Sequence, residues 1–192
     1  MDILNAAEQD TWRGGRSFTL RNRIYRAVWQ ITWFVFASWT PPQSNAWRRF
    51  LLRSFGAQVA STAGIYPSAR IWSPANLVIG DCACIGPRTT IYSMATITLE
   101  AYSLVSQGGC LCAGTHDIED QNFQLMARPI TLCRRAWVAA EAFVGPGVTI
   151  GRGAVLGARG CAFSNLEPWT VYAGNPARPL KTRAVRFSDC PT

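Results

Sequence analysis

The residue of this sequence best suited to acid–base chemistry is His116, the only histidine in the chain. It directly follows Thr115 and precedes a segment that carries the acids Asp117, Glu119 and Asp120. Because imidazole changes charge close to neutral pH, a histidine on a rigid support beside a loop can accept and return a proton. An isolated histidine is more often a surface residue with a structural hydrogen bond, so the setting of His116 must decide between the two interpretations.

Asp117 is a second candidate for the same chemistry, and the sequence leaves two interpretations of it open. As the neighbour of His116, it is placed to orient the imidazole or to bind the acceptor that loses the proton. As one of three carboxylates in a loop, it is equally well explained as a solvated surface charge.

Metal chemistry is not expected from the cysteine pattern. The chain has seven cysteines, and the pairs Cys82/Cys84 and Cys110/Cys112 have C-x-C spacing, whereas zinc and redox sites typically use C-x-x-C. One histidine adds little to such a site. The first ten residues carry acids and no basic segment ahead of an apolar run, so we expect no secretory signal, a cytoplasmic location and reduced thiols.

The element that must position His116 is a six-residue repeat. From Val59 onward a branched aliphatic residue recurs at every sixth position, with two-residue slips after Ile71 and Ile91. An α-helix and an alternating strand both lack period six, whereas a triangular solenoid has it, because each hexad forms one flat side and three hexads close a coil. Fourteen of the fifteen repeat positions are Val, Ile or Leu: Val59, Ile65, Ile71, Ile79, Ile85, Ile91, Leu99, Val105, Leu111, Leu132, Val138, Val144, Ile150 and Leu156, followed by Ala162.

A second restriction supports the same fold. The position four residues after each aliphatic residue is usually small, as at Ala63, Ala83 and Ala136, which suits a chain that turns a corner there. The two restrictions together predict an all-β protein, a left-handed parallel β-helix of hexapeptide repeats with an N-terminal helical arm and a short C-terminal tail. We place the arm at residues 1–58, the β-helix at 59–167 and the basic tail at 168–192.

The repeat is interrupted once at length, between Leu111 and Leu132. We expect residues 116–131 to form a catalytic loop with His116 at its root, directly after the corner residue Thr115. Loops held by a rigid scaffold commonly carry function. This setting favours the catalytic interpretation of His116.

The arm is both aromatic and basic. Residues 12–55 contain eleven large aromatic side chains, and residues 1–58 hold eight arginines against three acids. Pro41-Pro42 should end a helix that is predicted by a stripe of apolar residues at helical spacing. The stripe consists of Ile24, Val28, Ile31, Val35 and Trp39. A second helix is predicted at 46–55, before Gly56.

Two roles are open for the arm. Part of the stripe must pack on the first coil as its cap, because the end of a solenoid needs one. The surplus of aromatics and arginines suits peripheral contact with the cytoplasmic face of a membrane, and we expect no nucleic-acid partner. Its longest apolar stretch, residues 27–39, is too short to span a bilayer, which requires about 20 apolar residues.

Several segments resemble the hexapeptide-repeat O-acetyltransferases, a group that includes maltose, galactoside and nodulation-factor acetyltransferases. They are the repeat itself, GTHDIED at 114–120, RRAWVAAEAFVGPGVTIGRGAVLGA at 134–158 and YAGNPARPLKTR at 172–183. The segments WRGG and SWTPP and the aromatic arm are similar to the branch that acetylates exopolysaccharides such as colanic acid. The resemblance covers nearly the whole chain.

This resemblance implies acetyl-CoA as co-substrate, no metal, a homotrimer with active sites in grooves between neighbouring subunits, and His116 as general base toward a sugar hydroxyl. It assigns pantetheine and oxyanion contacts to the backbone around Trp137, Ala139 and Ala140, where several relatives have serine at the last position. Gly157 and Ala158 match the next pantetheine contact, and Arg178 and Lys181 match the residues that meet the CoA phosphates. The acceptor-binding region of the family corresponds to Thr90, Tyr92 and Ser93.

The acceptor class divides the enzyme interpretations. The leading one is O-acetylation of a saccharide in a lipid-linked or growing exopolysaccharide. A second is acetylation of a small soluble acceptor, either a free sugar or the amino group of a nucleotide sugar. A non-catalytic solenoid scaffold is a third, disfavoured by His116, Trp137 and Arg178. The zinc carbonic anhydrases built on this fold need three histidines per site, which one histidine per chain cannot supply from equivalent trimer positions.

Overall fold

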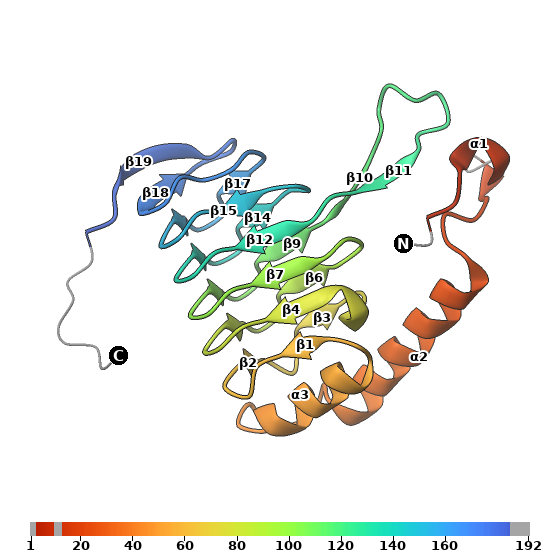
Figure 1. The fold of residues 1–192 in the computed structure, drawn as a ribbon, viewed down its shortest axis with the longest axis horizontal. Helices are drawn as coiled ribbons and strands as arrows, with labels where there is room; N and C mark the ends of the chain where they lie inside the picture. The colour runs from red at the N-terminus through yellow and green to blue at the C-terminus, as the bar shows by residue number, and fades with distance from the viewer. Residues whose placement is uncertain (1–2, 10–12, 185–192) are drawn as a thin grey trace.

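The computed structural model of the chain describes residues 3–9 and 13–184. Within them, short strands stack into a parallel β-helix with three flat sheets, and helices close its lower end (Figure 1). Each coil runs from sheet 1 to sheet 2 to sheet 3, and we name the corners after the sheets that they join. Sheet 1 contains β1 (Gln58–Val59), β4 (Leu77–Ile79), β7 (Ile97–Leu99), β12 (Ile130–Leu132) and β15 (Thr149–Ile150).

The other two sheets have the same parallel stacking. Sheet 2 contains β2 (Gly64–Ile65), β5 (Cys84–Ile85), β8 (Leu104–Val105), β13 (Trp137–Val138), β16 (Val155–Leu156), β18 (Thr170–Ala173) and the antiparallel edge strand β19 (Arg178–Thr182). Sheet 3 contains β3 (Arg70–Ile71), β6 (Thr90–Tyr92), β9 (Cys110–Cys112), β14 (Phe143–Val144) and β17 (Cys161–Ala162).

The predicted aliphatic repeat forms the core. All fifteen repeat positions are buried, none of them more than 8% exposed. In sheet 1, Val59, Ile79 and Leu99 stand in register in successive coils, and Leu132 and Ile150 continue the column. Each buried side chain of this kind contributes roughly 1.5–3 kcal/mol, so the stacked columns hold the coils together. The solenoid prediction is confirmed.

The corners explain the second restriction. Small residues such as Ala154 are buried there, and at most corners beyond the first coil the residue before the small one takes a left-handed backbone, with φ of 67° at Gly153 and 63° at Tyr102. A β-branched residue is strongly disfavoured in that conformation. Ala75 is an exception, because it lies exposed in the 3₁₀ turn η2 (Pro74–Asn76), where the coil is two residues longer.

Helices cover the open end of the first coil and saturate its unpaired carbonyls. The arm forms α1 (Ala6–Gln9), α2 (Leu20–Phe36) and α3 (Asn45–Ser54). Three arginines of α3 donate to edge carbonyls: Arg48 to Ile65 (2.6 Å), Arg49 to Ala63 (2.8 Å) and Arg53 to Val59 (2.9 Å). Two tryptophans of α2 do the same: the indole nitrogen of Trp29 donates to Ile71 (2.7 Å) and that of Trp33 to Pro67 (3.2 Å). These contacts blunt an edge that would otherwise pair with another strand.

The face that α2 packs on the solenoid differs from the expected one. Trp29 and Trp33 are buried, whereas the predicted stripe that includes Ile24 and Ile31 stays exposed. Both faces of α2 are apolar, so the stripe alone did not identify the buried side. The helix also ends at Phe36, because a turn follows it before the prolines. No helix among the described residues is long and apolar enough to cross a membrane.

The end of the chain continues the solenoid past the expected boundary at residue 168. Strand β18 stacks parallel on β16, with Tyr172 above Leu156 in the core column of sheet 2. Strand β19 then folds back antiparallel and is exposed along its length. The repeat weakens near Ala162 because that position is an alanine and because the next core residue, Leu166, follows after four residues instead of six.

Candidate active site

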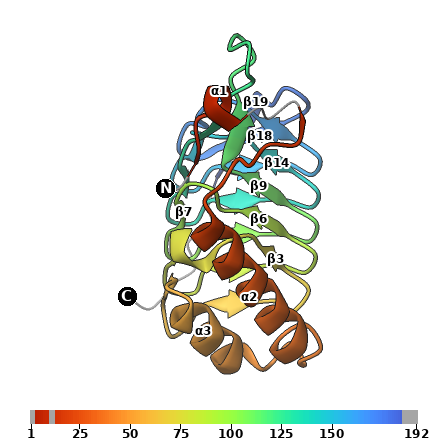
Figure 2. The same cartoon turned by 90° about the vertical axis from the view of Figure 1, so that its right-hand side faces the viewer.

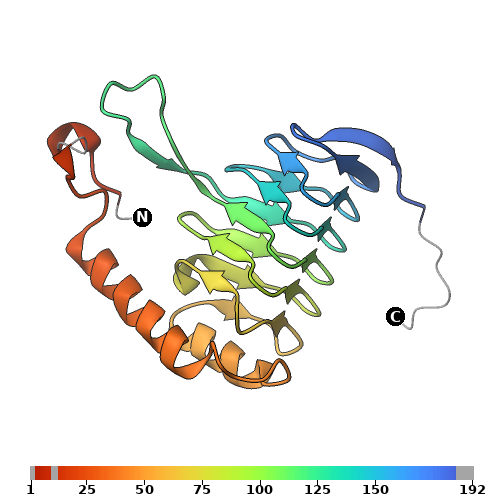
Figure 3. The same ribbon diagram turned by 180° about the vertical axis from the view of Figure 1, so that it is seen from behind.

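The long interruption of the repeat is a β-hairpin that leaves corner 3–1. Strands β10 (Gly114–His116) and β11 (Leu125–Ala127) pair antiparallel, with His116 opposite Leu125. Thr115 therefore lies in the hairpin and not at a buried corner. The root is tightly packed, because a Cβ on Gly114 would lie 2.3 Å from the Met94 sulfur. The hairpin projects from the solenoid on the side opposite β18 and β19 (Figures 1 and 3).

The hydrogen bond of His116 defines which of its nitrogens can act as a base. Its Nδ1 lies 2.7 Å from the carbonyl oxygen of Phe123, and the two rings stack with centroids 5.2 Å apart. A carbonyl oxygen only accepts, so Nδ1 carries the hydrogen in this arrangement. The lone pair of the neutral ring is then on Nε2, on an exposed side chain. The hairpin thus holds the imidazole in one orientation, with a ring nitrogen that can accept a proton.

Asp117 is not brought to the imidazole. Its backbone N–H donates to Gln124 O (2.8 Å), and its carboxylate accepts from the backbone N–H of Glu119 (3.0 Å). Both contacts shape the turn of the hairpin. These contacts support neither of the two interpretations open for Asp117. They do not place its carboxylate against the His116 ring, and they bind it to the hairpin backbone, which gives it a local structural role.

Gln124 ties the hairpin to the start of the chain, a contact that the sequence did not suggest. Its side-chain oxygen accepts from Ala6 N–H (2.7 Å), and its amide nitrogen donates to Leu4 O (3.2 Å). Gln124 directly follows Phe123, whose carbonyl holds the His116 ring. Figure 2 shows α1 beside the hairpin, above the helix α2. Residues 118 apart share no local pattern, so no sequence signal pointed to this clamp.

The predicted acceptor residues lie on the solenoid below the hairpin, in unequal settings. Ser93 is fully buried, and its hydroxyl both donates to Ser73 O (2.7 Å) and accepts from Ser73 N–H (3.0 Å), so it serves the corner. The ring of Tyr92 packs edge-on against Trp72, and burial raises the pKa of its phenol. Thr90 and Tyr92 line a small hollow of about 120 Å³ on sheet 3.

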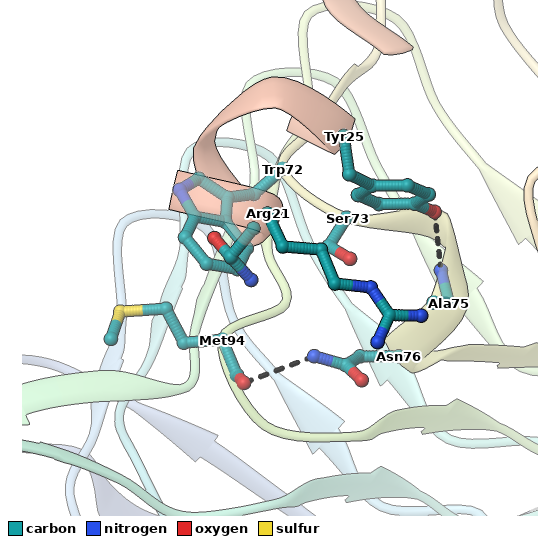
Figure 4. Close-up of a pocket in the computed structure, with 8 residues that line it drawn as sticks. Arg21, Tyr25, Trp72, Ser73, Ala75, Asn76 and Met94 are labelled. Carbon is teal, nitrogen blue, oxygen red and sulfur yellow. Dashed lines mark hydrogen bonds between the residues drawn. The ribbon is translucent and has the colours of Figure 1, made fainter. Parts of the chain in front are cut away.

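A larger cavity of about 380 Å³ lies between α2 and corner 3–1 (Figure 4). In that view the Arg21 side chain extends over Asn76, and the Tyr25 hydroxyl meets the backbone of Ala75. Met94, which packs against the hairpin root, forms part of the wall. The lining offers donors, acceptors and an aromatic surface: Arg21, Asn22, Tyr25, Trp72, Ser73, Ala75, Asn76 and Met94. This set was not predicted from the sequence, because three of its eight residues, Arg21, Asn22 and Tyr25, come from the arm.

The residues predicted to contact the acyl donor lie together on another side, along sheet 2 and corner 2–3. The Trp137 indole is partly exposed and donates to Ser106 Oγ (2.8 Å). The amides of Ala139 and Gly157 already donate to carbonyls of the next coil, Leu156 (2.9 Å) and Tyr172 (2.7 Å). Those two amides are therefore not available to an oxyanion.

Two amides at the same corner remain. Among the described residues, nothing accepts a hydrogen bond from the N–H of Ala140 or of Ala158, which stand one above the other in successive coils. Gly157 is closely packed against the next coil, since a Cβ there would lie 3.0 Å from Tyr172 O. The corner thus has two backbone donors without an acceptor among the described residues, and such donors can bind carbonyl oxygens.

Cations surround this second region. A cavity of about 420 Å³ on sheet 2 is lined by Tyr102, Leu104, Arg135, Ala136, Trp137 and Arg183. The Arg134 guanidinium lies 4.9 Å from the Tyr102 ring centroid. Arg178 and Lys181 are exposed on β19, the edge strand of the same sheet. Arg135 and Arg183 were not predicted, although the adjacent arginines at 134–135 and the basic tail contained the signal.

The chain alone does not unite the two regions. The His116 hairpin leaves corner 3–1, whereas the amides of Ala140 and Ala158 belong to corner 2–3 and the cations to sheet 2. Among the described residues, no group of three or more His, Cys, Asp or Glu side chains is arranged to hold a metal ion.

Comparison with known proteins gives a consistent result. No protein-family model matches the sequence. The chain is 41% identical over 172 residues to WcaF of Escherichia coli (strain K12), whose name assigns it to colanic acid biosynthesis as an acetyltransferase; the match covers 90% of this chain and 91% of the relative.

Solved structures match the fold as well. A maltose O-acetyltransferase from Clostridium difficile 630 superposes with a TM-score of 0.76 at 19% identity, covering 87% of this chain and 90% of the other. A hexapeptide-repeat acetyltransferase from Vibrio cholerae O1 biovar eltor, in complex with acetyl coenzyme A, gives 0.76 at 19%, covering 95% and 100%. The prediction of a left-handed β-helix of hexapeptide repeats is confirmed.

Proposed function

Because the chain belongs to the family of hexapeptide-repeat acetyltransferases that contains WcaF, and is an acetyltransferase, we propose that it transfers the acetyl group of acetyl-CoA to a sugar hydroxyl of an exopolysaccharide precursor. The observation that carries this proposal is the His116 ring, whose Nδ1–H is held by Phe123 O while Nε2 has no hydrogen bond among the described residues. A base of this kind suits a hydroxyl, which must lose its proton as it attacks. Family membership leaves no room for the scaffold interpretation.

The active site in this proposal is shared between protomers of a homotrimer. His116 and the donor-binding residues lie on different sides of one chain, so the hairpin of one protomer must meet sheet 2 and corner 2–3 of its neighbour. Threefold closure of such a heterologous contact creates three equivalent grooves. The separation of the two regions within the chain supports this assembly.

Acetyl-CoA would lie along corner 2–3 of the neighbouring protomer. The N–H groups of Ala140 and Ala158, which have no acceptor in the part of the chain that the structure describes, can bind oxygens of the acyl and pantetheine portions, and the Trp137 ring offers an apolar contact. Arg135, Arg178, Lys181 and Arg183 provide positive charge for the phosphates, whose oxygens form strong charge-assisted hydrogen bonds. No part of this surface requires a metal ion.

The chemical step follows from the tautomer of His116. The free Nε2 takes the proton of the sugar hydroxyl as its oxygen attacks the thioester carbonyl, forming a new C–O bond. The Ala140 N–H stabilises the oxyanion of the tetrahedral intermediate. The C–S bond then breaks, and the imidazolium returns the proton to the departing thiolate, giving free CoA and the acetyl ester. No covalent acyl-enzyme is formed.

The acceptor would occupy the cavity between α2 and corner 3–1, next to the hairpin root. Its lining provides an arginine, an asparagine and a tryptophan, a combination of polar donors and aromatic surface suited to a saccharide. Thr90 and Tyr92 border this region, whereas Ser93 acts through the corner. A saccharide carried on a lipid is the acceptor that we favour, since Arg21, Asn22 and Tyr25 of the arm form part of the lining.

The test is an acceptor comparison. The protein is incubated with labelled acetyl-CoA and either free sugars, nucleotide amino sugars or lipid-linked oligosaccharides, and ester or amide products are separated. We expect O-acetylation that is most efficient with the lipid-linked acceptor. Efficient transfer to a free sugar or to an amino group, with none to the lipid-linked acceptor, would establish the alternative of a small soluble acceptor.

A further inference from the structure

Two features of the arm have no role in acetyl transfer. One is a cavity of about 440 Å³ between α2 and the segment that precedes it. Its lining consists of Gly14, Gly15, Arg16, Ser17, Phe18, Arg23 and Arg26. The other is an apolar stripe on the outer face of the same helix. The stripe consists of Leu20, Ile24, Val28, Ile31 and Val35 and is joined by exposed aromatics at the end of α2 and around α3: Phe34, Phe36, Trp39, Trp47 and Phe50.

The cavity collects positive charge without a counter-charge from its own segment. Three guanidinium groups line it, and no Asp or Glu occurs anywhere between residues 11 and 80. Arg23 and Arg26 are three residues apart on α2, a spacing at which like charges repel. The pKa of Arg26 is lowered mainly by burial and further by the nearby charge of Arg23. The Arg26 guanidinium lies over the rings of Phe18 and Trp72. An anion in this cavity would relieve the repulsion.

The stripe lies opposite the packed face of α2. On the helix its members point away from Trp29 and Trp33, and Arg21 and Arg23 flank it on either side. Ile31 is 64% exposed and Phe34 is 75% exposed. Figure 2 shows α2 on the outside of the solenoid, running diagonally down to its base. With 17 residues the helix is about 25 Å long, which is enough for it to lie flat in the interface between lipid headgroups and acyl chains. It is not among the helices that are long and apolar enough to cross a membrane, of which the described residues contain none.

We propose that the arm docks on an anionic membrane surface, with a lipid phosphate group seated among Arg16, Arg23 and Arg26 and the α2 stripe embedded at the level of the acyl chains. Arginines beside an apolar helix face complement anionic headgroups above a hydrocarbon layer. A neighbouring protomer fits the stripe less well, because the contact proposed between protomers uses the hairpin and not the outer face of α2. This docking is independent of the acetyl-transfer chemistry.

The basic arm contributes in two different ways. Arg48, Arg49 and Arg53 are hydrogen-bonded to edge carbonyls of the first coil and serve the cap. The lipid contacts therefore fall to Arg16 and Arg23, which are exposed, and to the partly buried Arg26. Only a subset of the arginines counted in the sequence should affect membrane binding.

The experiment uses the full chain and two vesicle types, phosphatidylcholine alone and phosphatidylcholine with phosphatidylglycerol, in a co-sedimentation assay. We expect binding to the anionic vesicles, weakened by salt. Each arginine near such a surface contributes about 1 kcal/mol, so the double variant Arg16→Gln/Arg23→Gln should bind about 25-fold more weakly. The matched control Arg88→Gln/Arg152→Gln removes the same charge from exposed corners of the solenoid and should bind like the unaltered protein.

A second pair of variants tests the stripe. Ile31→Ser/Phe34→Ser should reduce vesicle binding at least about tenfold through lost apolar burial, whereas Phe163→Ser, on an exposed aromatic at the far end of the solenoid, should not. Sedimentation in solution should give the same oligomeric mass for all variants. A lower mass for Ile31→Ser/Phe34→Ser would show that the stripe is an interface between copies and would overturn the proposal.

A third measurement distinguishes a lipid phosphate from a soluble phosphate as the ligand of the cavity. Inorganic pyrophosphate is titrated into the protein by calorimetry, and into the vesicle assay as competitor. Weak binding of pyrophosphate that is abolished in Arg16→Gln/Arg23→Gln, together with vesicle binding, supports the proposal. Tight binding of pyrophosphate without binding to anionic vesicles would overturn it in favour of a site for a soluble anion.

Discussion

Gln124 should act as a positioning residue for the general base, and replacing it with Leu isolates that role. The substitution keeps the side chain's approximate volume but removes the hydrogen bonds to Ala6 N–H (2.7 Å) and Leu4 O (3.2 Å). Two such bonds contribute about 1 kcal/mol each, so up to roughly 2 kcal/mol of restraint on the hairpin is lost. If that restraint acts on the orientation of His116, kcat should fall about 5- to 30-fold.

The kinetic pattern distinguishes positioning from general destabilisation. KM for acetyl-CoA should not change in Gln124→Leu, because the donor-binding residues lie on sheet 2 and at corner 2–3. Deletion of residues 1–9 removes the other half of the clamp and should lower kcat by a similar factor. Combining the two changes should cost little more than either alone, since both remove one interaction.

Steady-state kinetics with a fixed acceptor and varied acetyl-CoA measure these quantities, and the mass and melting temperature of each variant control for folding. Gln124→Glu is the matched variant, because it retains the acceptor for Ala6 N–H and should lose less activity than Gln124→Leu. Unchanged kcat in a correctly assembled Gln124→Leu would refute the reasoning. Strictly multiplicative effects of Gln124→Leu and the deletion would do the same.

Three further outcomes are expected. His116→Ala should lower kcat by roughly 10² to 10⁴ while binding of acetyl-CoA, followed by calorimetry, stays intact; near-normal turnover would remove His116 from the mechanism. Arg48→Met should reduce the free energy of unfolding by about 3–5 kcal/mol in a denaturant titration, because this buried guanidinium serves five acceptors; a loss below about 1 kcal/mol would contradict its role in the cap. Burial raises the pKa of the Cys110 thiol from 9.0 to about 11. The buried neutral thiol therefore contributes its full share to the free energy of unfolding below pH 9, and this share is lost as the pH rises toward about 11. Denaturant titrations across this range should decline less steeply for Cys110→Ala, and equal slopes would argue against the shift.

The solenoid could be predicted because its information is periodic. Every coil repeats the same requirement at the same spacing, so fifteen positions reported on one geometry, and all of them are buried as expected. The hairpin was visible as the place where this period fails. Its strand pairing and the position of Thr115 within β10 were not, because a short polar segment carries no comparable period.

The arm was harder to predict for a physical reason. Helix α2 is apolar on opposite faces, so the spacing of Ile24 and Ile31 did not reveal that Trp29 and Trp33 make the buried contact. Hydrogen bonding decides the matter, since both indoles reach carbonyls at the edge of the first coil.

The candidate site depends on details that the sequence does not display. The resemblance directed attention to corner 2–3, where the amide of Ala139 is already bonded in the ladder, whereas that of Ala140 has no acceptor among the described residues. Gln124 and Arg21 were missed because their roles depend on contacts between segments far apart in the chain. Contacts of that kind leave no spacing for a single sequence to display.

The central claim is that His116 of one protomer works with the donor-binding corner of the next. Two variants, His116→Ala and Ala158→Trp, each disable one half of the groove and should be nearly inactive alone. When the two are co-expressed and assemble randomly, one groove in four combines two intact halves, so activity should recover to about a quarter of the unaltered enzyme. Activity that stays at the level of the separate variants, in trimers verified to contain both chains, would contradict the shared groove.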